Sequence, residues 1–284
     1  MINNFVVDYQ VIGACNLKCD FCDGAPKYLS GESEDTVKSG IDKLVSAGAS
    51  TIVFTGGEPL LRKDMPKLIR HAFDSGLRVY LSTNAAFLFR CYDKIKDLIH
   101  CLGMPLDGST PEMNFLMTRG REQFAITTDV LKYFKKNPPS HRVKVGTVVS
   151  KINLGDIMNV GRHIFCNDQL QAPNTWRLYQ FTPLGDGMES RQRHEISDYD
   201  FRKTYIEMQR AFSNRDVSPL SNADSDNSYI FINPAQEIQV LTGDQYKPFG
   251  NLKTISVDEL RQFRDSFISV IGKGGNNRRW LDAK

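Results

Sequence analysis

The sequence predicts an α/β protein, built as a partial (β/α)6 barrel of the TIM type with a C-terminal α+β extension. One observation is that short apolar, β-branched runs alternate six times with segments of helical spacing. Such a series implies parallel strands joined by right-handed crossovers. The second is that the 284 residues are 40% hydrophobic and 24% charged, the proportions of a globular protein with a large core.

The first half of the chain supplies three of the strand–helix units. An apolar strand is expected at 5–12, followed by a glycine- and cysteine-containing loop at 15–31. Residues 34–47 carry apolar side chains at helical spacing, with Gly48 as a candidate C-cap. The second and third units are expected as follows: strand 51–55 with helix 65–74, and strand 77–82 with helix 92–99.

The remaining units follow the same alternation. They are strand 101–106 with helix 124–135, strand 143–150 with helix 154–165, and strand 175–181. The pattern changes beyond residue 185. There we expect a polar loop at 185–195, a helix at 198–212, a hairpin of 229–233 and 237–241, a helix at 257–270 and a basic tail. We expect residues 1–185 to form the core barrel. Residues 186–284 are expected to pack on it and help close a substrate site.

Composition excludes several classes of protein. No apolar run approaches the roughly 18 residues of a membrane-spanning helix, and the N-terminus lacks the pattern of a signal peptide. We therefore expect a cytoplasmic protein without a membrane partner. The net charge of +3 permits an anionic ligand. The sequence has no dense cluster of Lys and Arg with interleaved aromatics, so we do not expect nucleic acid as a partner.

Three of the six cysteines fall within eight residues, as Cys15, Cys19 and Cys22 in the pattern C-x3-C-x2-C. In a reducing compartment such a cluster indicates metal or redox chemistry. A structural zinc site takes four protein ligands, and no second cysteine pair is present. Three thiolates on a [4Fe–4S] cluster leave one iron open to a substrate or cofactor. A zinc loop or chance spacing remains the alternative. The other cysteines are isolated, and we expect core roles for them: Cys91, Cys101 and Cys166.

A second motif, Gly56-Gly57-Glu58-Pro59, ends the second expected strand. Two glycines allow backbone to approach a ligand closely, and Glu58 offers an anion to an ammonium group. Both motifs fall at the carboxyl ends of expected parallel strands, where α/β barrels build their active sites.

The two motifs in this order resemble the radical SAM superfamily. The resemblance implies a [4Fe–4S] cluster held by the three cysteines, with S-adenosylmethionine (SAM) on the open iron. Phe21 matches an aromatic position of the family, and the segment Gly56 to Pro59 would bind the methionyl amino group. Thr83 and Asn84 would contact SAM as well, although both residue types also suit a helix cap. Arg119 is assigned to the cofactor by the same resemblance.

The implied chemistry is reductive cleavage of SAM to a 5′-deoxyadenosyl radical, which abstracts a substrate hydrogen. An external one-electron donor of the flavodoxin or ferredoxin type would supply the electron. No cysteine follows Cys166, which argues against the auxiliary clusters of many peptide-modifying members.

The downstream half is similar to the viperin-like branch of the superfamily, whose antiviral members convert CTP to 3′-deoxy-3′,4′-didehydro-CTP. The likeness rests on an ordered series of short segments, among them residues 144–153, 176–180, 196–200 and 273–275 with Trp280. It implies an anionic nucleotide as substrate, with Lys144, Arg177 and Lys273 facing its phosphates. Thr51 and Thr175 stand where that branch has cations.

Two other functions remain open at this point. One is a radical SAM enzyme acting on a peptide or small natural-product precursor. The other is a metal-binding module without enzymatic activity, which predicts no SAM binding and an inconsequential Glu58.

Overall fold

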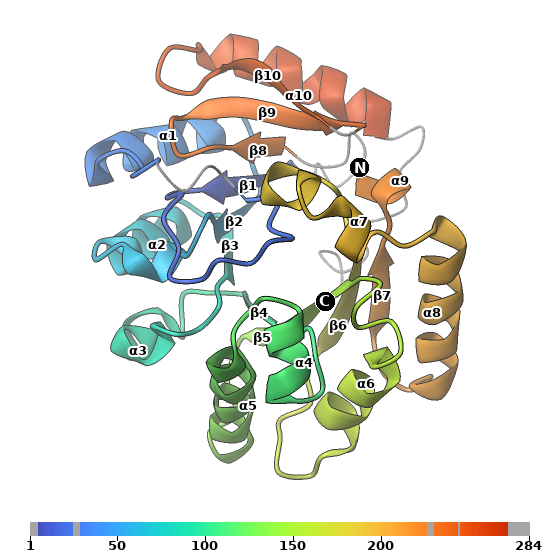
Figure 1. Cartoon of the computed structure of the whole chain (residues 1–284). Coiled ribbons are helices and arrows are strands. Elements are labelled where there is room, and N and C mark those ends of the chain that lie inside the picture. Colours follow the sequence, from blue (N-terminus) through green and yellow to red (C-terminus); the bar gives the residue numbers. More distant parts are fainter. Residues whose placement is uncertain (1–4, 25–28, 226–229, 244, 272–284) are drawn as a thin grey trace.

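Ten strands form one hydrogen-bonded sheet in the order β10-β9-β8-β1-β2-β3-β4-β5-β6-β7. This is a computed structural model that describes residues 5–24, 29–225, 230–243 and 245–271. The parallel pairs run from β1 to β7 in chain order, and β8 adds parallel to the other side of β1. In Figure 1 the strands surround the centre, with helices α1, α2, α3, α5, α6, α8 and α10 around their outside.

The strands are short, and most of their residues are buried. Their bounds are β1 Val6–Gln10, β2 Thr51–Thr55, β3 Arg78–Ser82, β4 Cys101–Pro105, β5 Arg142–Val149, β6 Thr175–Gln180, β7 Val217–Leu220, β8 Ile230–Ile232, β9 Glu237–Thr242 and β10 Gln245–Asn251. The α-helices are α1 Glu34–Ser46, α2 Met65–Asp74, α3 Tyr92–Ile95, α4 Pro111–Leu116, α5 Arg121–Lys136, α6 Ile157–Cys166, α7 Arg191–His194, α8 Asp198–Ala211, α9 Asn222–Ser225 and α10 Val257–Ile271. Three 3-10 helices complete the set: η1 Pro59–Leu61, η2 Leu88–Arg90 and η3 Gly185–Met188.

Local sequence accounts for the outer helices. Ser33 caps α1 by accepting a hydrogen bond from the Thr36 backbone N–H, and acidic residues fill the first turn. Ser197 caps α8 in the same way through the N–H of Asp200. Each helix buries one apolar stripe against the sheet, so the core lies between the strands and the helix ring.

The predicted partial barrel is confirmed. Eight parallel strands follow barrel order from β1 to β8, and β8 returns to pair with β1 through the register Asp8 to Phe231. Within the described residues β7 and β8 are not hydrogen-bonded neighbours, so the sheet has edges at β7 and β10. The predicted hairpin is also present as β8 and β9, which pair antiparallel.

Several elements differ from the prediction. The helix expected at 92–99 is shorter: α3 ends at Ile95, and the residues after it form irregular turns. The loop expected at 185–195 contains η3 and α7, and α7 buries His194 completely. Tertiary contacts of that side chain, rather than an apolar pattern, hold this turn of helix. Helix α4 was not predicted. Strands β7 and β10 were not predicted either, because both lie at an edge of the sheet and both contain proline, which weakens the sequence pattern of a strand.

Residues beyond 185 contribute to both ends of the same sheet. Strand β7 extends it beside β6, and β8 to β10 extend it beside β1. Helix α10 packs against α1 through an Arg264 Nη1 to Ala47 carbonyl hydrogen bond of 2.5 Å. No helix in the described part of the chain has both the length and the apolar character needed to cross a bilayer.

Candidate functional site

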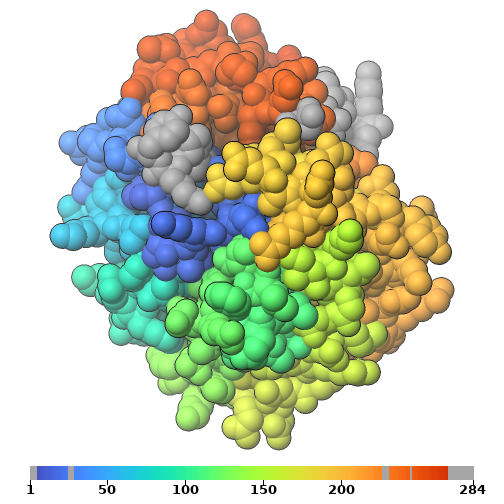
Figure 2. All heavy atoms as spheres, in the orientation of Figure 1, coloured from blue at the N-terminus to red at the C-terminus, as the bar shows by residue number. Residues whose placement is uncertain are grey.

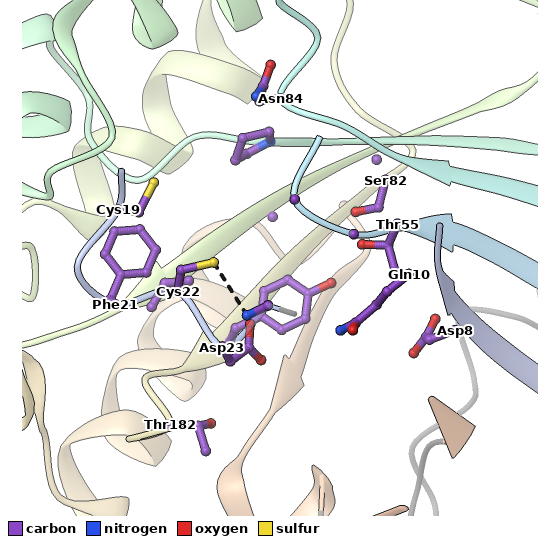
Figure 3. A pocket seen from close by; sticks show the side chains of 18 of the residues that line it. Asp8, Gln10, Cys19, Phe21, Cys22, Asp23, Thr55, Ser82, Asn84 and Thr182 are labelled. Atoms are coloured by element: carbon purple, nitrogen blue, oxygen red, sulfur yellow. Dashed lines mark hydrogen bonds between the residues drawn. The ribbon is translucent and has the colours of Figure 1, made fainter. Parts of the chain in front are cut away.

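A cavity of about 370 Å³ lies where the carboxyl ends of the parallel strands meet. Its volume falls in the range of small-molecule sites, and its position is the usual one for α/β barrels. Figure 3 shows two opposing groups of side chains. The loop after β1 supplies Cys19, Phe21 and Cys22 on one side. The strands supply a polar group on the other side: Asp8, Gln10, Thr55 and Ser82.

The cysteine loop, residues 15–24, brings all three motif thiols to this cavity. Two sulfurs accept backbone hydrogen bonds: Cys15 Sγ from the N–H of Leu17 and Cys22 Sγ from the N–H of Gly24, both at 3.4 Å. Backbone donors to sulfur are one means by which proteins tune an iron–sulfur centre. Burial, reinforced by the adjacent Asp23 carboxylate, raises the pKa of the Cys22 thiol to about 11.

The cysteine loop has the donors that an iron–sulfur cluster requires. It presents three thiols to one cavity, with backbone N–H groups directed at two of the sulfurs. As they stand, no three His, Cys, Asp or Glu side chains in the described ranges are grouped closely enough to hold a metal ion. The three thiols therefore match a [4Fe–4S] cluster in the type of donor and in lining the same cavity. The remaining cysteines lie apart. The expected core role is confirmed for Cys101, which is buried in the barrel interior, and Cys91 is partly buried against the core. This expectation is wrong for Cys166, which is exposed at the end of α6.

Gly56 and Gly57 are required by a crossing of two backbone segments. A Cβ at Gly57 would lie 2.2 Å from the carbonyl oxygens of Gly13 and Ala14, and one at Gly56 would lie 2.3 Å from that of Ile12. The φ of Gly56 is +143°, which also favours glycine. The sequence interpretation assigned the glycines to approach of a ligand. In the structure they approach the chain leading into the cysteine loop, and both also line the cavity.

Glu58 lies behind the cavity wall. Its side chain is fully buried and does not line the cavity. The carboxylate accepts hydrogen bonds from Thr83 Oγ1 at 2.6 Å, from the Asn84 N–H at 2.7 Å and from the Leu60 N–H at 2.9 Å. Burial raises its pKa above the ordinary value, against the opposing effect of these donors. Pro59 follows as the first residue of η1 and is likewise buried outside the lining.

Thr83 and Asn84 do line the cavity, and Glu58 fixes the turn that presents them. Asn84 Nδ2 donates to Asn16 Oδ1 at 2.7 Å, which ties this turn to the cysteine loop. The next residue, Ala85, has a φ of +64°, a conformation that non-glycine residues rarely adopt. Such strain concentrates at functional sites and persists only where surrounding contacts enforce it.

Phe21 and Arg119 form a layered contact beside the thiols. The Arg119 guanidinium lies 4.9 Å from the centre of the Phe21 ring and forms an ion pair with Asp107. Asp107 is completely buried and also accepts a hydrogen bond from the Val148 N–H at 2.7 Å. Both Phe21 and Arg119 line the cavity, and their contact with the cofactor stays a prediction.

The three residues expected to face phosphates are not brought together by the described structure. Lys144 lines the cavity, where its Nζ donates to Tyr179 Oη at 3.1 Å. Arg177 is buried outside the lining and donates to Ser218 Oγ at 3.3 Å. Lys273 lies outside the described residues.

The two threonines at expected cation positions also lie outside the lining. Thr175 Oγ1 donates to Asp216 Oδ2 at 2.6 Å and accepts from Arg142 Nη2 at 3.2 Å. Thr51 is buried in β2. Thr175 thus belongs to a hydrogen-bonded network with Arg142 and Asp216.

Sequence reasoning missed several polar residues of the cavity. Asp8 and Gln10 point inward from β1, and Tyr179 does so from β6. The next residue, Gln180, also borders the cavity, but its Nε2 donates to Asp198 of α8 at 2.8 Å. The available signal was the pair of polar side chains two residues apart in an otherwise apolar strand, since alternate residues share a face. That pattern marks an inward polar surface in a barrel strand.

The family model described as "Radical SAM superfamily" matches residues 9–164, more than half of the chain. The chain belongs to the radical SAM superfamily. That family works with a [4Fe–4S] cluster and SAM, and these are the cofactors of this radical SAM protein.

Curated relatives carry different activities. An Fe-coproporphyrin III synthase of Methanosarcina barkeri is 38% identical over 108 residues, which cover 36% of this chain and 27% of the relative. A SAM-dependent nucleotide dehydratase of Flammeovirga pacifica is 25% identical over 249 residues, covering 82% of each chain. The radical SAM protein spans between 27% and 58% of the length of the first three curated relatives.

A crystal structure of Streptococcus suis SuiB bound to precursor peptide SuiA has the same fold. The TM-score is 0.71 at 13% identity, with 91% of this chain and 64% of that chain covered. The agreement supports the partial barrel and the position of its strand ends.

The three-thiol loop, the polar turn at Thr83 and Asn84 and the polar strand wall all line the same cavity. A radical SAM enzyme needs this order of parts. The protein positions cofactor and substrate and excludes water, while the cofactor supplies the difficult step.

Proposed function

We propose that this radical SAM protein acts on a nucleotide, removing a ribose hydrogen and eliminating water as in the conversion of CTP to its 3′-deoxy-3′,4′-didehydro form. The observation that carries the proposal is a polar strand wall, containing Lys144 and Asp8, that faces the cysteine loop across the cavity. The likeness to the Flammeovirga pacifica nucleotide dehydratase over 82% of both chains supports it.

In this proposal Cys15, Cys19 and Cys22 hold the cluster. Bound together, the cluster and SAM supply the 5′-deoxyadenosyl radical that removes the hydrogen. The turn at Thr83 and Asn84, fixed by Glu58, contacts the methionyl part of SAM. Phe21 and Arg119 close the same side and keep water away from the reacting atoms.

The substrate would bind against the strands. Lys144 supplies a cation for a phosphate, and the Asp8 carboxylate and Gln10 amide accept hydrogen bonds from sugar hydroxyls. Among the described lining residues the cations are Arg119 and Lys144 and the acids are Asp8 and Asp23. With Arg119 engaged by Asp107, this wall offers a single phosphate contact from Lys144.

The test is anaerobic reconstitution with SAM, a reductant and a panel of cytidine, CMP, CDP, CTP and the other nucleoside triphosphates. We expect one nucleotide to accelerate 5′-deoxyadenosine formation by about tenfold or more, with a product lighter by one water. Equal rates with and without every member of the panel would contradict the proposal. The graded phosphate series shows how much charge the site requires.

A further inference from the structure

The outer side of the cysteine loop is bound to residues far along the chain. Asp20, between Cys19 and Phe21, accepts at Oδ1 from Thr118 Oγ1 at 2.6 Å and at Oδ2 from Arg193 Nη1 at 3.0 Å. Its backbone carbonyl accepts from Ser190 Oγ at 2.7 Å. Figure 2 shows this blue part of the chain reaching the surface between the green segment of α4 and the yellow segment of α7.

His194, the last residue of α7, completes this set of contacts. Its Nε2 lies 2.8 Å from Asp20 Oδ1, and its Nδ1 lies 3.2 Å from Ser150 Oγ. The carboxylate can only accept when ionised, so Nε2 carries the hydrogen of that contact. The imidazole is fully buried.

The His194 ring also packs against the aromatic residue next to Cys22. Its centre lies 5.6 Å from that of Phe21 and 5.3 Å from that of Phe181. Phe21 therefore has Arg119 at 4.9 Å as one neighbour and His194 as another. Through Asp20 and Phe21, His194 fixes both residues that lie between Cys19 and Cys22.

The order Asp20, His194, Ser150 matches that of a hydrolytic triad, but the surroundings exclude that chemistry. Ser150 is fully buried, and its Oγ accepts from the Ile152 N–H at 3.1 Å. A triad serine must meet a substrate carbonyl. Here none of the three residues lines the cavity, so a substrate bound there would not meet Ser150.

We propose that His194 is a positioning residue for the iron–sulfur centre: its contacts with Asp20 and Phe21 fix the turn between Cys19 and Cys22 and set the retention and reduction potential of the cluster. Partners outside the ligand set orient metal ligands, and their loss typically lowers metal affinity by 10- to 100-fold. Charge and hydrogen bonding near the sulfurs set the potential of such a cluster. Without the His194 donor, the Asp20 carboxylate presents more negative charge and disfavours the reduced state.

Two substitutions separate the hydrogen bonds from the packing. His194→Phe keeps an aromatic ring between Phe21 and Phe181 and removes both polar contacts. His194→Gln keeps a side-chain N–H for Asp20. Asp20→Asn removes the negative charge and retains an acceptor. Gln192→Ala, at an exposed position of the same helix, is the matched control.

The readouts are iron release to a chelator and redox titration of the reconstituted cluster, followed by electron paramagnetic resonance. For His194→Phe we expect iron release to accelerate about tenfold. The ratio of reduced to oxidised cluster at fixed potential should fall about tenfold, a shift of about 59 mV for one electron. Asp20→Asn should shift the ratio the opposite way, and both His194→Gln and Gln192→Ala should stay near wild type.

A folded His194→Phe protein with wild-type potential and iron release would overturn the proposal. If His194→Phe does not fold, the comparison of Asp20→Asn with wild type decides. The proposal then fails if Asp20→Asn leaves the potential unchanged or moves it in the negative direction. No measurement uses a nucleotide, so the result is independent of the proposed substrate.

Discussion

The carboxylate of Glu58 accepts two hydrogen bonds from the turn that lines the cavity and a third from the Leu60 N–H of η1, while its own side chain stays outside the lining. The acidic residue and its neighbourhood were predicted from the sequence. Its direction was not, because a four-residue motif does not show which way a side chain at a strand end points. Thr83 and Asn84 are thus the residues through which Glu58 acts on the cavity.

Replacing Glu58 should alter stability in a pH-dependent way. Burial raises the pKa of this carboxyl in the folded chain, so the folded state keeps a proton that the unfolded state has released. The contribution of the Glu58 carboxyl to the free energy of unfolding is therefore complete below the ordinary carboxyl pKa. It is lost as the pH rises through the pKa of the folded state. Glu58→Gln is neutral throughout and leaves imperfectly matched donors, a cost of about 1–3 kcal/mol. The stability gap between wild type and variant should shrink with rising pH.

Urea unfolding of the cluster-free protein at pH 5, 7 and 9 measures that gap. Glu122→Gln, at an exposed carboxylate, is the control and should stay within about 0.5 kcal/mol of wild type. A gap that widens with pH would contradict the assignment.

Cys19 is the most buried of the three motif thiols. Cys19→Ala should remove the cluster, because two thiols do not hold a [4Fe–4S] centre. We expect SAM cleavage to fall to about one hundredth of the wild-type rate or less. Iron analysis and 5′-deoxyadenosine assay check this, with Cys166→Ala at an exposed position as the control. Retained cleavage in Cys19→Ala would contradict the cluster assignment.

At the scale of elements, the segments after β1 and β2 form one crossing. The Gly57 N–H donates to the Ile12 carbonyl at 2.7 Å, and the Glu58 N–H donates to that of Ala14 at 2.9 Å. The cysteine loop and the Gly56 segment are thus held in register by backbone bonds. Sequence alone predicted both segments but could not show that they touch, since this contact joins residues more than 40 positions apart.

Gly57→Ala tests this crossing. The added Cβ would lie 2.2 Å from two carbonyl oxygens, so the two segments must separate. We expect a loss of stability of about 3 kcal/mol or more and a matching loss of SAM affinity. Gly155→Ala, where the added Cβ meets nothing within 4 Å, should remain near wild type. Thermal unfolding and equilibrium dialysis with SAM decide, and equal behaviour of the two variants would refute the explanation.

The alternation of strands and helices made the barrel predictable, because six buried strands and the longer amphipathic helices follow local periodicity. Helix α7 was not predictable in this way. Its four residues contain three exposed polar side chains and the buried His194, a pattern typical of a loop. Such short elements depend on tertiary partners, here Asp20 and Ser150.

At the scale of the whole molecule, the net charge of +3 does not gather at the cavity. Several cations of the barrel strands are engaged within the wall, as in the contact of Arg142 with Asp216 at 3.9 Å. The described lining balances two cations with two acids. Composition permitted an anionic substrate, but only the structure shows which cations line the cavity.

Lys144→Gln tests the proposed contact between Lys144 and a phosphate of the substrate. If Lys144 binds a phosphate, its loss should raise the KM for the active nucleotide by about tenfold or more, as expected for a charged hydrogen bond. The corresponding nucleoside, which lacks the phosphate, should be affected far less. Lys151→Gln, an exposed neighbour on the chain, is the control. An equal effect on nucleotide and nucleoside would assign Lys144 to another part of the substrate.

The contacts that hold Asp20 form late during synthesis of the chain. Ser190, Arg193 and His194 follow Asp20 by 170, 173 and 174 residues. At synthesis rates of about 5–20 residues per second, the cysteines leave the ribosome roughly 10–35 s before these anchors. During that interval the loop lacks these contacts, and the outer side of the loop is completed only when α7 has been synthesised.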